Sequence, residues 1–435
     1  MTSIRLGLCG IGTVGGGVLE LLRRNGEALA GRAGAPLEVV HVGARRDRDG
    51  VDTGSATVSR EVLAVADDPA VDILVEAIGG TDDAHELVRR ALEAGKHVVT
   101  ANKALIAEHG NELLALAEEK GVSLRFEAAV AGGIPIIKAL REGLAANRVS
   151  WLAGIINGTG NFILTEMAGE EREFADVLAE AQALGYAEAD PTFDVEGIDA
   201  AHKLVILAAI AFNTPLRFDA VYTEGISALT PEDLAYAEEL GYVVKHLGVA
   251  RETGAGLELR VHPTLLPKDL LLAKVAGVKN AVLVEGDAVG PTMYYGAGAG
   301  GGATASAVVA DVIDLARELS RGQRCPLPSL GVPMGELREL PILPMGEVRT
   351  AWYLRLEAED RPGVMSQVSS ILGDQGISIE ALIQKAPQPG QTRVPVVVVT
   401  NVASQGNLER AVMAIEALDS IAGPVTRIRV ESLDG

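Results

Sequence analysis

One stretch of this sequence, residues 181–203, carries most of the side chains that could perform acid–base chemistry. Its carboxylates precede a single lysine, Lys203, and they are Glu188, Asp190, Asp194, Glu196 and Asp199. Asp199 and Lys203 are four residues apart, so both would lie on one face of a helix. The ordinary interpretation of this spacing is an exposed ion pair that contributes little to stability.

The residues that follow Lys203 favour a functional interpretation instead. Residues 204–212 are all uncharged and apolar, and residues 198–212 have the length and composition of a helix buried on most sides. A buried ammonium group is costly unless it is paired, and its pKa shifts readily. Lys203 is therefore a candidate proton donor or anion-binding group, with Asp199 as its partner.

The N-terminus predicts a nucleotide-binding loop. Ile4, Leu6 and Leu8 alternate as in a short strand, and a glycine-rich segment leads from this strand into a helical pattern. The candidate cofactor-binding residues of the segment are Gly10, Gly12, Thr13, Val14 and Gly15. Glycines let the backbone approach a pyrophosphate, to which the helix N-terminus offers free N–H groups. The alternative is a tight strand-to-helix turn in an ordinary α/β domain.

The choice between NAD and NADP depends on the end of the second predicted strand, residues 37–42. An NAD site usually carries Asp or Glu there, to bind the ribose 2′-hydroxyl. This sequence has Arg45 and Arg46, which suit a 2′-phosphate, so it favours NADP. Asp47 and Asp49 follow closely, and NAD remains possible.

Two more predicted strands end in polar or flexible residues. The apolar run 71–78 ends at Gly79, and the strand 97–100 ends at Thr100, shortly before Lys103. Ligands bind at the carboxyl ends of parallel strands in doubly wound folds, so these three residues are candidates for the cofactor site. The alternative for Lys103 is a surface lysine at the start of a helix.

Composition excludes several classes of protein. The 435 residues allow roughly three domains, and 48% hydrophobic residues are ample for large cores. A net charge of −21 argues against nucleic-acid binding. We expect neither a membrane span nor a signal peptide, and the predicted location is cytoplasmic. Cys9 and Cys325 cannot form a disulfide framework or a metal site, which fits a reducing compartment.

The stretch 181–203 resembles the signature of the homoserine dehydrogenase family. The pattern A-x3-G-Y-x-E-x-D-P-x2-D-V-x-G-x-D-x3-K has its fixed positions at Ala181, Gly185, Asp190, Pro191, Asp194, Gly197, Asp199 and Lys203. The resemblance spans residues 4–320 and implies reversible, NAD(P)H-dependent reduction of L-aspartate 4-semialdehyde to L-homoserine. Protonation of the alkoxide formed by hydride transfer needs an acid, for which Lys203 is our first choice and Lys103 our second.

The resemblance also assigns roles to residues elsewhere in the chain. It implies that Lys103 lies beside the nicotinamide, that Gly185 and the glycine loop at Gly300 serve the cofactor, and that amino-acid biosynthesis is the setting. The residues expected to bind the substrate are Gly158, Thr159, Tyr186, Glu188, Asp194 and Asp199. A monovalent cation, Na⁺ or K⁺, would be held by Glu127 and by the carbonyls of Val130, Gly132 and Ile134, although the sequence shows no clustered His or Cys ligands.

The C-terminal region resembles an ACT domain, a regulatory module for small ligands. Its predicted order is βαββαβ, with D-R-P-G-V at 360–364 after the first strand and G-I-S-I-E at 376–380 after the first helix. We expect it to bind an amino-acid effector, L-threonine first, and to pair between subunits of a homodimer or homotetramer. A dimerising tail with an empty site is the alternative.

The fold predicted for the whole chain is α/β. It comprises a Rossmann-type dinucleotide-binding domain at 1–133, completed by a helix at 303–321, and an α+β substrate and dimerisation domain at 134–302. A proline-rich linker at 322–349 would lead to the ACT domain at 350–432. Two rival functions remain open: another NAD(P)-dependent dehydrogenase on the same scaffold, and a catalytically inactive amino-acid sensor.

Overall fold

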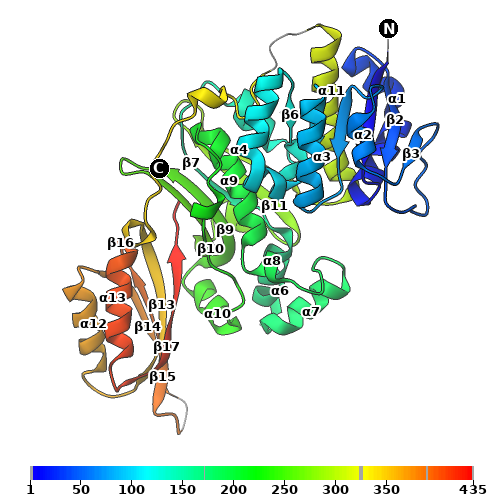
Figure 1. The fold of residues 1–435 in the computed structure, drawn as a ribbon. Coiled ribbons are helices and arrows are strands. Elements are labelled where there is room, and N and C mark those ends of the chain that lie inside the picture. Colours follow the sequence, from blue (N-terminus) through cyan, green and yellow to red (C-terminus); the bar gives the residue numbers. More distant parts are fainter. Residues whose placement is uncertain (1–2, 171, 323–326, 388–389, 434–435) are drawn as a thin grey trace. The chain divides into compact units, whose positions relative to one another are not determined.

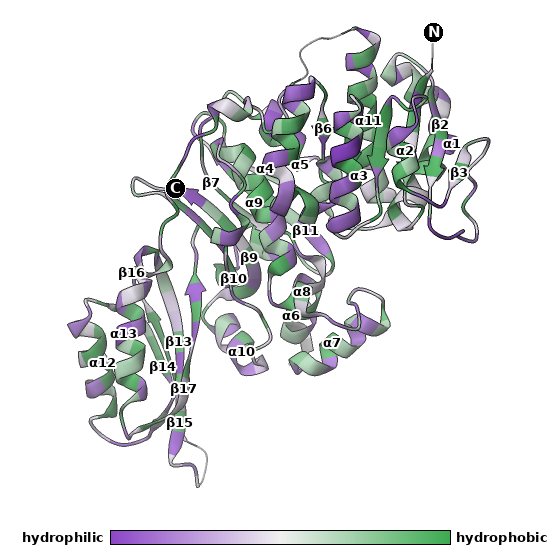
Figure 2. Ribbon diagram, in the orientation of Figure 1, coloured by the Kyte–Doolittle hydropathy of each residue, from purple (hydrophilic) through white to green (hydrophobic). Residues whose placement is uncertain are grey.

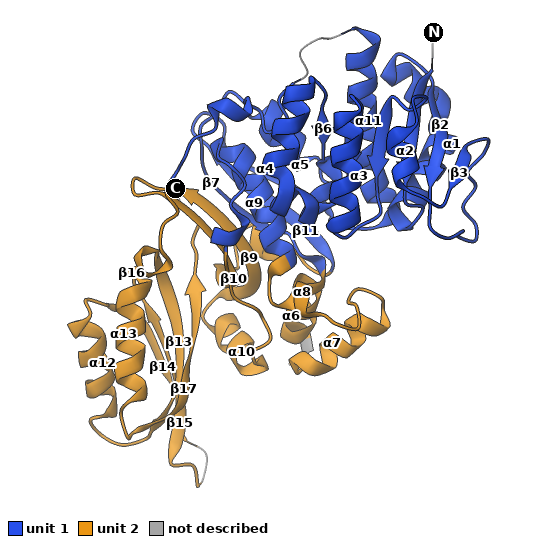
Figure 3. Cartoon of the chain, viewed as in Figure 1, with its two compact units in different colours: residues 1–158, 199–221, 278–340 blue, residues 159–198, 222–277, 341–435 orange. Residues whose placement is uncertain are grey.

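The computed structural model describes the chain except residues 1–2, 171, 323–326, 388–389 and 434–435. The chain forms two compact units, each built from three separate segments (Figure 3). Unit 1 comprises residues 1–158, 199–221 and 278–340, and unit 2 comprises residues 159–198, 222–277 and 341–435. Within the described residues, no helix has both the length and the apolar character needed to cross a membrane.

The first half of unit 1 is a parallel sheet with the strand order β3-β2-β1-β4-β5-β6 (Figure 1). Its strands are β1 (Ile4–Cys9), β2 (Leu37–Gly43), β3 (Thr57–Ser59), β4 (Ile73–Glu76), β5 (His97–Thr100) and β6 (Leu124–Arg125). The helices that follow them are α1 (Thr13–Ala33), α2 (Leu63–Asp67), α3 (Asp82–Glu93) and α4 (Lys103–Lys120). Parallel strands need such crossovers, and the order reverses between β1 and β4, where doubly wound folds bind ligands.

A later helix, α11 (Gly301–Ser320), completes this sheet by packing against α1. Buried residues of α11, among them Val308 and Val312, share one hydrophobic cluster with Leu6 and Leu8 of β1 and with Val18 of α1. The strands are hydrophobic along most of their length, whereas α3 shows many hydrophilic residues (Figure 2). This pattern buries the sheet between helices and leaves the strand ends to form the site.

The rest of unit 1 contains an antiparallel group of strands and a nearly fully buried helix. The strands are β7 (Val149–Ile155), β11 (Lys279–Gly286) and β12 (Gly290–Ala297), with β11 paired to both of the others. The short helices η1 (Glu127–Ala129) and α5 (Ile136–Lys138) precede them. Helix α9 (Ile198–Phe212) has the bounds predicted for it, and almost all of its side chains are buried.

Unit 2 contains helices α6 (Gly158–Glu170, from residue 159 onward), α7 (Phe174–Ala183), α8 (Thr192–Val195) and α10 (Pro231–Glu239). Its strands β8 (Tyr222–Thr223) and β9 (Tyr242–Glu252) both pair with β10 (Leu257–Pro267). The C-terminal elements are β13 (Arg349–Glu359), α12 (Val364–Asp374), β14 (Ile379–Gln384), β15 (Arg393–Thr400), β16 (Ala403–Ser404), α13 (Gln405–Glu416) and β17 (Ile421–Val430). Apart from the short β16, this is the predicted βαββαβ order.

The C-terminal elements are joined to the rest of unit 2 by backbone and side-chain contacts. Strand β17 pairs in parallel with β10, with Arg429 opposite Thr264. Arg355 of β13 donates to Asp233 of α10 at 2.6 Å, and the Tyr353 hydroxyl donates to the same carboxylate at 3.2 Å. The region that resembles an ACT domain therefore extends the sheet at β10 and is hydrogen-bonded to helix α10.

The sequence pattern also predicts a helix at 231–247 and a turn at 158–161, and both of these local predictions are wrong. A single helix was expected at 231–247, but α10 ends at Glu239 and strand β9 begins at Tyr242. Gly241 has a φ of +85°, a left-handed conformation that glycine adopts without strain, and β-branched Val243 and Val244 then favour a strand. The turn expected at 158–161 is the first turn of α6.

Candidate active site

The predicted pair of Asp199 and Lys203 is present, and a second lysine joins it within unit 1. Lys203 Nζ lies 2.7 Å from Asp199 Oδ2, and Lys103 Nζ lies 3.1 Å from Asp199 Oδ1. Lys203 also donates to the carbonyl oxygen of Ile156 at 2.7 Å. Asn157 Nδ2 donates to Asp199 Oδ2 at 2.8 Å. One carboxylate thus holds two ammonium groups and an amide.

Three secondary-structure elements bring this cluster together. Asp199 and Lys203 lie one turn apart near the start of α9, and Asn157 follows the end of β7. Lys103 is the first residue of α4, where Asn102 caps the helix by accepting from the Leu105 N–H at 3.1 Å. Lys103 therefore stands at the carboxyl end of β5, as predicted, and meets a carboxylate far away in the sequence.

Most of the cluster is buried, and this burial affects the pKa of Asp199. The side chains of Asp199 and Lys203 are 6% and 12% exposed, whereas that of Lys103 is 34% exposed. Burial alone would raise the pKa of Asp199, but attraction to the ammonium groups of Lys203 and Lys103 outweighs it and lowers the pKa to about 2. Asp199 is therefore ionised at every pH at which the protein would work.

The residue before Lys203 on α9 connects this helix to α4. His202 is buried and its Nε2 lies 3.1 Å from Oε1 of Glu108 on α4, while its ring stacks on Phe218 with centroids 4.2 Å apart. These contacts fix the two helices that carry Lys203 and Lys103. Mispositioning by even about 1 Å can cost a hundredfold in rate, so this support matters.

The loop between β1 and α1 fits a dinucleotide. A Cβ at Gly15 would lie 1.9 Å from the Gly10 carbonyl oxygen, and a Cβ at Gly10, where φ is +94°, would lie 2.4 Å from the Ala77 carbonyl oxygen. At Gly12 the nearest atom is a side-chain nitrogen of Arg48 at 3.7 Å, so this position is open on the cavity side. The first and third glycines thus allow tight packing, and the second leaves room for a phosphate.

A cavity of about 470 Å³ adjoins this loop. Its lining includes Gly10, Gly12, Arg45 and Gly79 of the predicted cofactor residues, together with Arg46 and Arg48. Arg45 forms an ion pair with Asp83, but both side chains remain mostly exposed. The cavity therefore combines a glycine-rich loop with three arginines and two carboxylates, Asp47 and Asp83, and the loop and the arginines suit a phosphorylated ligand.

The glycine loop before α11 returns to the same place. Gly300 caps α11 with a φ of +116°, and a Cβ at Gly301 would lie 2.9 Å from the carbonyl oxygen of Thr13. A Cβ at Gly17 would in turn lie 2.7 Å from the Gly301 carbonyl oxygen. The loop at Gly300 and Gly301 thus packs closely against the nucleotide-binding segment, and its contact with the cofactor stays a prediction.

The sequence did not single out Glu76, a carboxylate that holds the ends of β4 and β5 together beside the predicted cofactor residues Gly79 and Thr100. Glu76, at the end of β4, is fully buried and accepts hydrogen bonds from the Ile78 N–H at 2.8 Å and from the Thr100 hydroxyl. Burial raises its pKa. Asn102 Nδ2 donates to the Gly80 carbonyl at 2.6 Å, which links the same loop to the start of α4. A carboxylate at the end of the apolar run 71–78 was the available signal.

Glu127, the predicted cation ligand, is buried beside a second carboxylate. Its oxygens accept from the Ile137 N–H at 3.0 Å and the Lys138 N–H at 2.8 Å, and its own N–H donates to Asp311 at 2.8 Å. Burial, helped by the charge of Asp311, raises the pKa of Glu127 to about 7. The carbonyl of Ile134 accepts from the Ile136 N–H at 2.8 Å. Val130 and Gly132 lie in the same buried loop.

Other predicted substrate residues lie in unit 2, namely Thr159, Tyr186, Glu188 and Asp194, together with Gly185 from the cofactor set. The Thr159 hydroxyl donates to the Tyr186 carbonyl at 2.7 Å, and the Tyr186 ring meets Phe162 edge-on at 5.1 Å between centroids. Gly185 has a φ of +75° in the turn after α7. Gly158, in unit 1, packs so closely that a Cβ would lie 2.9 Å from the Val278 carbonyl oxygen.

Comparison with known families matches nearly the whole chain. Residues 10–127 match the NAD-binding domain of homoserine dehydrogenase, residues 135–313 match the homoserine dehydrogenase family itself, and residues 352–419 match the ACT domain. The first of these segments contains the glycine loop and Lys103, and the second contains Asp199 and Lys203.

Individual relatives agree with these matches. A homoserine dehydrogenase of Pseudomonas aeruginosa is 58% identical over 434 residues, covering 100% of both chains. The crystal structure of a homoserine dehydrogenase from Thiobacillus denitrificans superposes with a TM-score of 0.95 at 55% identity, covering 100% of this chain and 99% of that one. A hyperthermophilic archaeal homoserine dehydrogenase in complex with NADPH has a TM-score of 0.60 at 28% identity, covering 72% of this chain and 98% of that one. The chain belongs to the homoserine dehydrogenase family, a family of NAD(P)-dependent oxidoreductases.

Proposed function

We propose that this chain catalyses the reversible reduction of L-aspartate 4-semialdehyde to L-homoserine. The observation that carries the proposal is the buried Lys103–Asp199–Lys203 cluster. Reduction of an aldehyde needs a hydride and a proton, and such a cluster offers an acid in a site that excludes water.

The proton is the part of the reaction that the protein itself supplies. The bound nicotinamide cofactor would deliver a hydride to the aldehyde carbon. Lys203 stabilises the negative charge that develops on the substrate oxygen and transfers a proton to it, which leaves the alcohol and a neutral amine. Asp199 holds the ammonium of Lys203 in position, and Lys103 supplies a second positive charge. In the reverse direction Lys203 accepts the proton of the hydroxyl.

Recognition of the amino-acid part of the substrate needs carboxylates for its ammonium group. Glu188 and Asp194 are our choice for that role, with Gly158, Thr159 and Tyr186 contributing backbone and hydroxyl contacts. Asp199 is committed to the two lysines, so its contribution is to orient them.

NADP(H) is the proposed preferred cofactor, with NAD(H) as a weaker substitute. Arg45 lies at the end of β2 on the cavity beside the glycine loop, where a 2′-phosphate would need a cation. The archaeal relative was solved with NADPH, which supports the same choice. Gly185 and Gly300 would complete the contacts to this cofactor.

A Na⁺ or K⁺ ion is the proposed partner of Glu127. A buried carboxylate beside Asp311 is unfavourable when ionised, and a bound cation would relieve this. Carbonyl oxygens of Val130, Gly132 and Ile134 would supply the remaining ligands, since hard cations prefer oxygen. The ion would hold the loop at residues 127–134 in place between the nucleotide-binding segment and helix α5.

Regulation by an amino acid, L-threonine first, is proposed for the ACT region. The turn at Asp360–Gly363 precedes α12, whose free N–H groups suit a carboxylate. We further infer a homodimer or homotetramer working in the cytoplasm. Such modules commonly close their ligand sites by pairing between subunits.

The proposed reaction is tested by following NADPH oxidation with L-aspartate 4-semialdehyde. The matched control is succinate semialdehyde, which has the same aldehyde but no ammonium group. We expect turnover with the first substrate and at most a small fraction of it with the second. Consumption of neither NADPH nor NADH would contradict the proposed reaction. Equal rates with both aldehydes would contradict the proposed recognition.

A further inference from the structure

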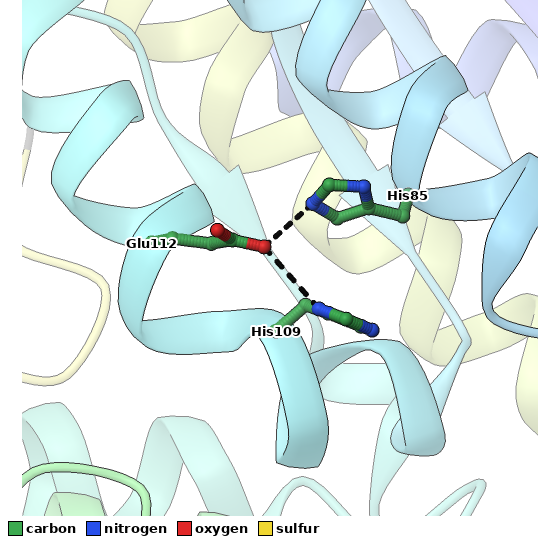
Figure 4. Close-up of side chains that lie close together, drawn as sticks. All are labelled: His85, His109 and Glu112. Atoms are coloured by element: carbon green, nitrogen blue, oxygen red, sulfur yellow. Dashed lines mark hydrogen bonds and ion pairs between the residues drawn. The ribbon is translucent and has the colours of Figure 1, made fainter.

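Two half-buried histidines and one exposed glutamate lie together on the neighbouring helices α3 and α4, and none of the three takes part in the site described above (Figure 4). His85 comes from α3, and His109 and Glu112 come from α4. Glu112 Oε1 lies 2.6 Å from His85 Nε2 and 3.2 Å from His109 Nδ1. In Figure 4 both imidazoles turn a ring nitrogen toward this one carboxylate.

The arrangement follows from the sequence and from helix geometry. His109 and Glu112 are three residues apart, so they project from the same face of α4. Helices α3 and α4 pack together, which brings His85 to that face. The two rings are in contact, with centroids 4.6 Å apart. Two helices therefore present two imidazoles and one carboxylate to a single point.

These donor atoms match a transition-metal site in type and spacing. All three ligand atoms lie within 4.8 Å of one another. Tetrahedral Zn²⁺ with bonds of about 2.0–2.1 Å places its ligand atoms roughly 3.3 Å apart, close to the His109–Glu112 distance. The His85–Glu112 distance of 2.6 Å must lengthen by about 0.7 Å to reach this spacing, which Glu112 can accommodate because its side chain is 61% exposed.

The chemistry of the site selects the kind of metal. Two imidazole nitrogens and one carboxylate oxygen suit Zn²⁺ and similar borderline ions such as Co²⁺ and Ni²⁺, whereas Mg²⁺ and Ca²⁺ prefer oxygen alone. The site differs from the Glu127 loop, whose buried oxygens suit a monovalent cation. It is also separate from the other five histidines, of which His41, His202, His246 and His262 are buried.

We infer that His85, His109 and Glu112 form a surface site for a zinc-class divalent metal ion, with water in the fourth position. The ion would replace a network of hydrogen bonds by bonds that join α3 to α4. Helix α4 begins with Lys103, and its Glu108 contacts His202 of α9. The bound ion would thus stabilise unit 1 and the helix that carries Lys103, without contacting the reacting atoms.

The test uses the full-length protein in a Cys325→Ser background, so that this thiol cannot compete for metal. Calorimetric titration with Zn²⁺ and the visible absorption of Co²⁺ are measured after treatment with EDTA. We expect one equivalent to bind, with the intense bands of four-coordinate Co²⁺. Saturating Zn²⁺ should raise the unfolding temperature, because a ligand that binds the folded state stabilises it.

The variants are His85→Ala, His109→Ala and Glu112→Gln, and the control is Glu119→Gln, which makes the same charge change two turns further along α4. Each of the three should weaken Zn²⁺ binding by at least about tenfold and abolish the thermal shift, because each removes a direct ligand. The control should behave as the parent. Thermal unfolding in EDTA shows whether each variant is folded. If the alanine variants are not folded, the isosteric Glu112→Gln still tests whether this cluster binds the metal.

Two results would overturn the inference. The first is Zn²⁺ affinity in the three variants equal to that of Glu119→Gln, which would place any bound metal elsewhere. The second is the absence of Co²⁺ bands and of a thermal shift in the parent protein, which would leave a hydrogen-bonded surface cluster only.

Discussion

Asp199 and Lys203 form an ion pair of 2.7 Å in which neither side chain is more than 12% exposed. Removing two charges from water costs several kcal/mol per ion, and replacing such a pair by apolar residues often stabilises a protein. A surface ion pair of this kind would not indicate a function. A buried pair whose carboxylate also binds Lys103 and Asn157 is best explained by a catalytic role. The buried ion pair therefore supports the catalytic role that we propose for Lys203.

The low pKa of Asp199 predicts a specific loss of stability in acid. Its folded value of about 2 lies below its ordinary value of 3.8, so its stabilising contribution is present above the ordinary value and is lost as the pH falls toward 2. The contribution is about 2 kcal/mol at neutral pH, with roughly half of it lost by pH 3. Denaturant unfolding at pH 5 and pH 3 should show this difference between the wild type and Asp199→Asn. Parallel pH dependences in the two proteins would contradict it.

Glu127 predicts the opposite dependence. Its folded pKa of about 7 exceeds its ordinary value of 4.5, so its protonation stabilises the fold below 4.5 and this contribution is lost as the pH rises through 7. At pH 8, NaCl or KCl should therefore raise the unfolding temperature more than choline chloride of the same ionic strength. Glu127→Gln should remove the difference between the salts. A response to all three salts that is equal in both proteins would exclude a bound cation.

The sequence was sufficient for the fold class and for helix α9, because an apolar run and a four-residue spacing report local structure directly. It was insufficient where tertiary contacts decide. The approach of Lys103 to Asp199 joins helices far apart in the chain, and no local pattern encodes it. The position of Glu76 at the end of an apolar strand was visible in the sequence, but its complete burial and its hydrogen bond with Thr100 depend on tertiary structure. The prediction of one helix at 231–247 was wrong because the helical spacing of apolar residues continues across Gly241, whereas the left-handed conformation of this glycine ends the helix.

Arg45 should determine the preference for NADPH. Arg45→Asp would repel the 2′-phosphate and could accept a hydrogen bond from a 2′-hydroxyl, so we expect the Kd of NADPH to rise by about tenfold or more and that of NADH to change much less. The control is Arg24→Asp on the exposed part of α1, which makes the same charge change. Equal changes for both cofactors would show that Arg45 does not recognise the phosphate.

The ACT region should make the enzyme sensitive to an amino acid. Millimolar L-threonine is expected to inhibit the wild type, and Asp360→Ala should raise the inhibitory concentration by about tenfold or more by removing a partner of the ligand's ammonium group. A point variant is preferable to truncation, because β17 pairs with β10. Asp374→Ala, at the other end of α12, is the control. Equal inhibition of both variants, or no response to threonine, serine, methionine or lysine, would exclude this site.

We propose that Lys203 donates the proton to the substrate oxygen, and the turnover of Lys203→Ala with saturating L-aspartate 4-semialdehyde and NADPH tests this role. We predict a fall in kcat of roughly a thousandfold or more, with the Kd of NADPH unchanged within about twofold, because the lysine acts on the substrate and not on the dinucleotide. Lys103→Ala, measured alongside, should also weaken NADPH binding. If Lys203→Ala kept most of its kcat, the proton would have to come from another group and the proposed role of Lys203 would be wrong.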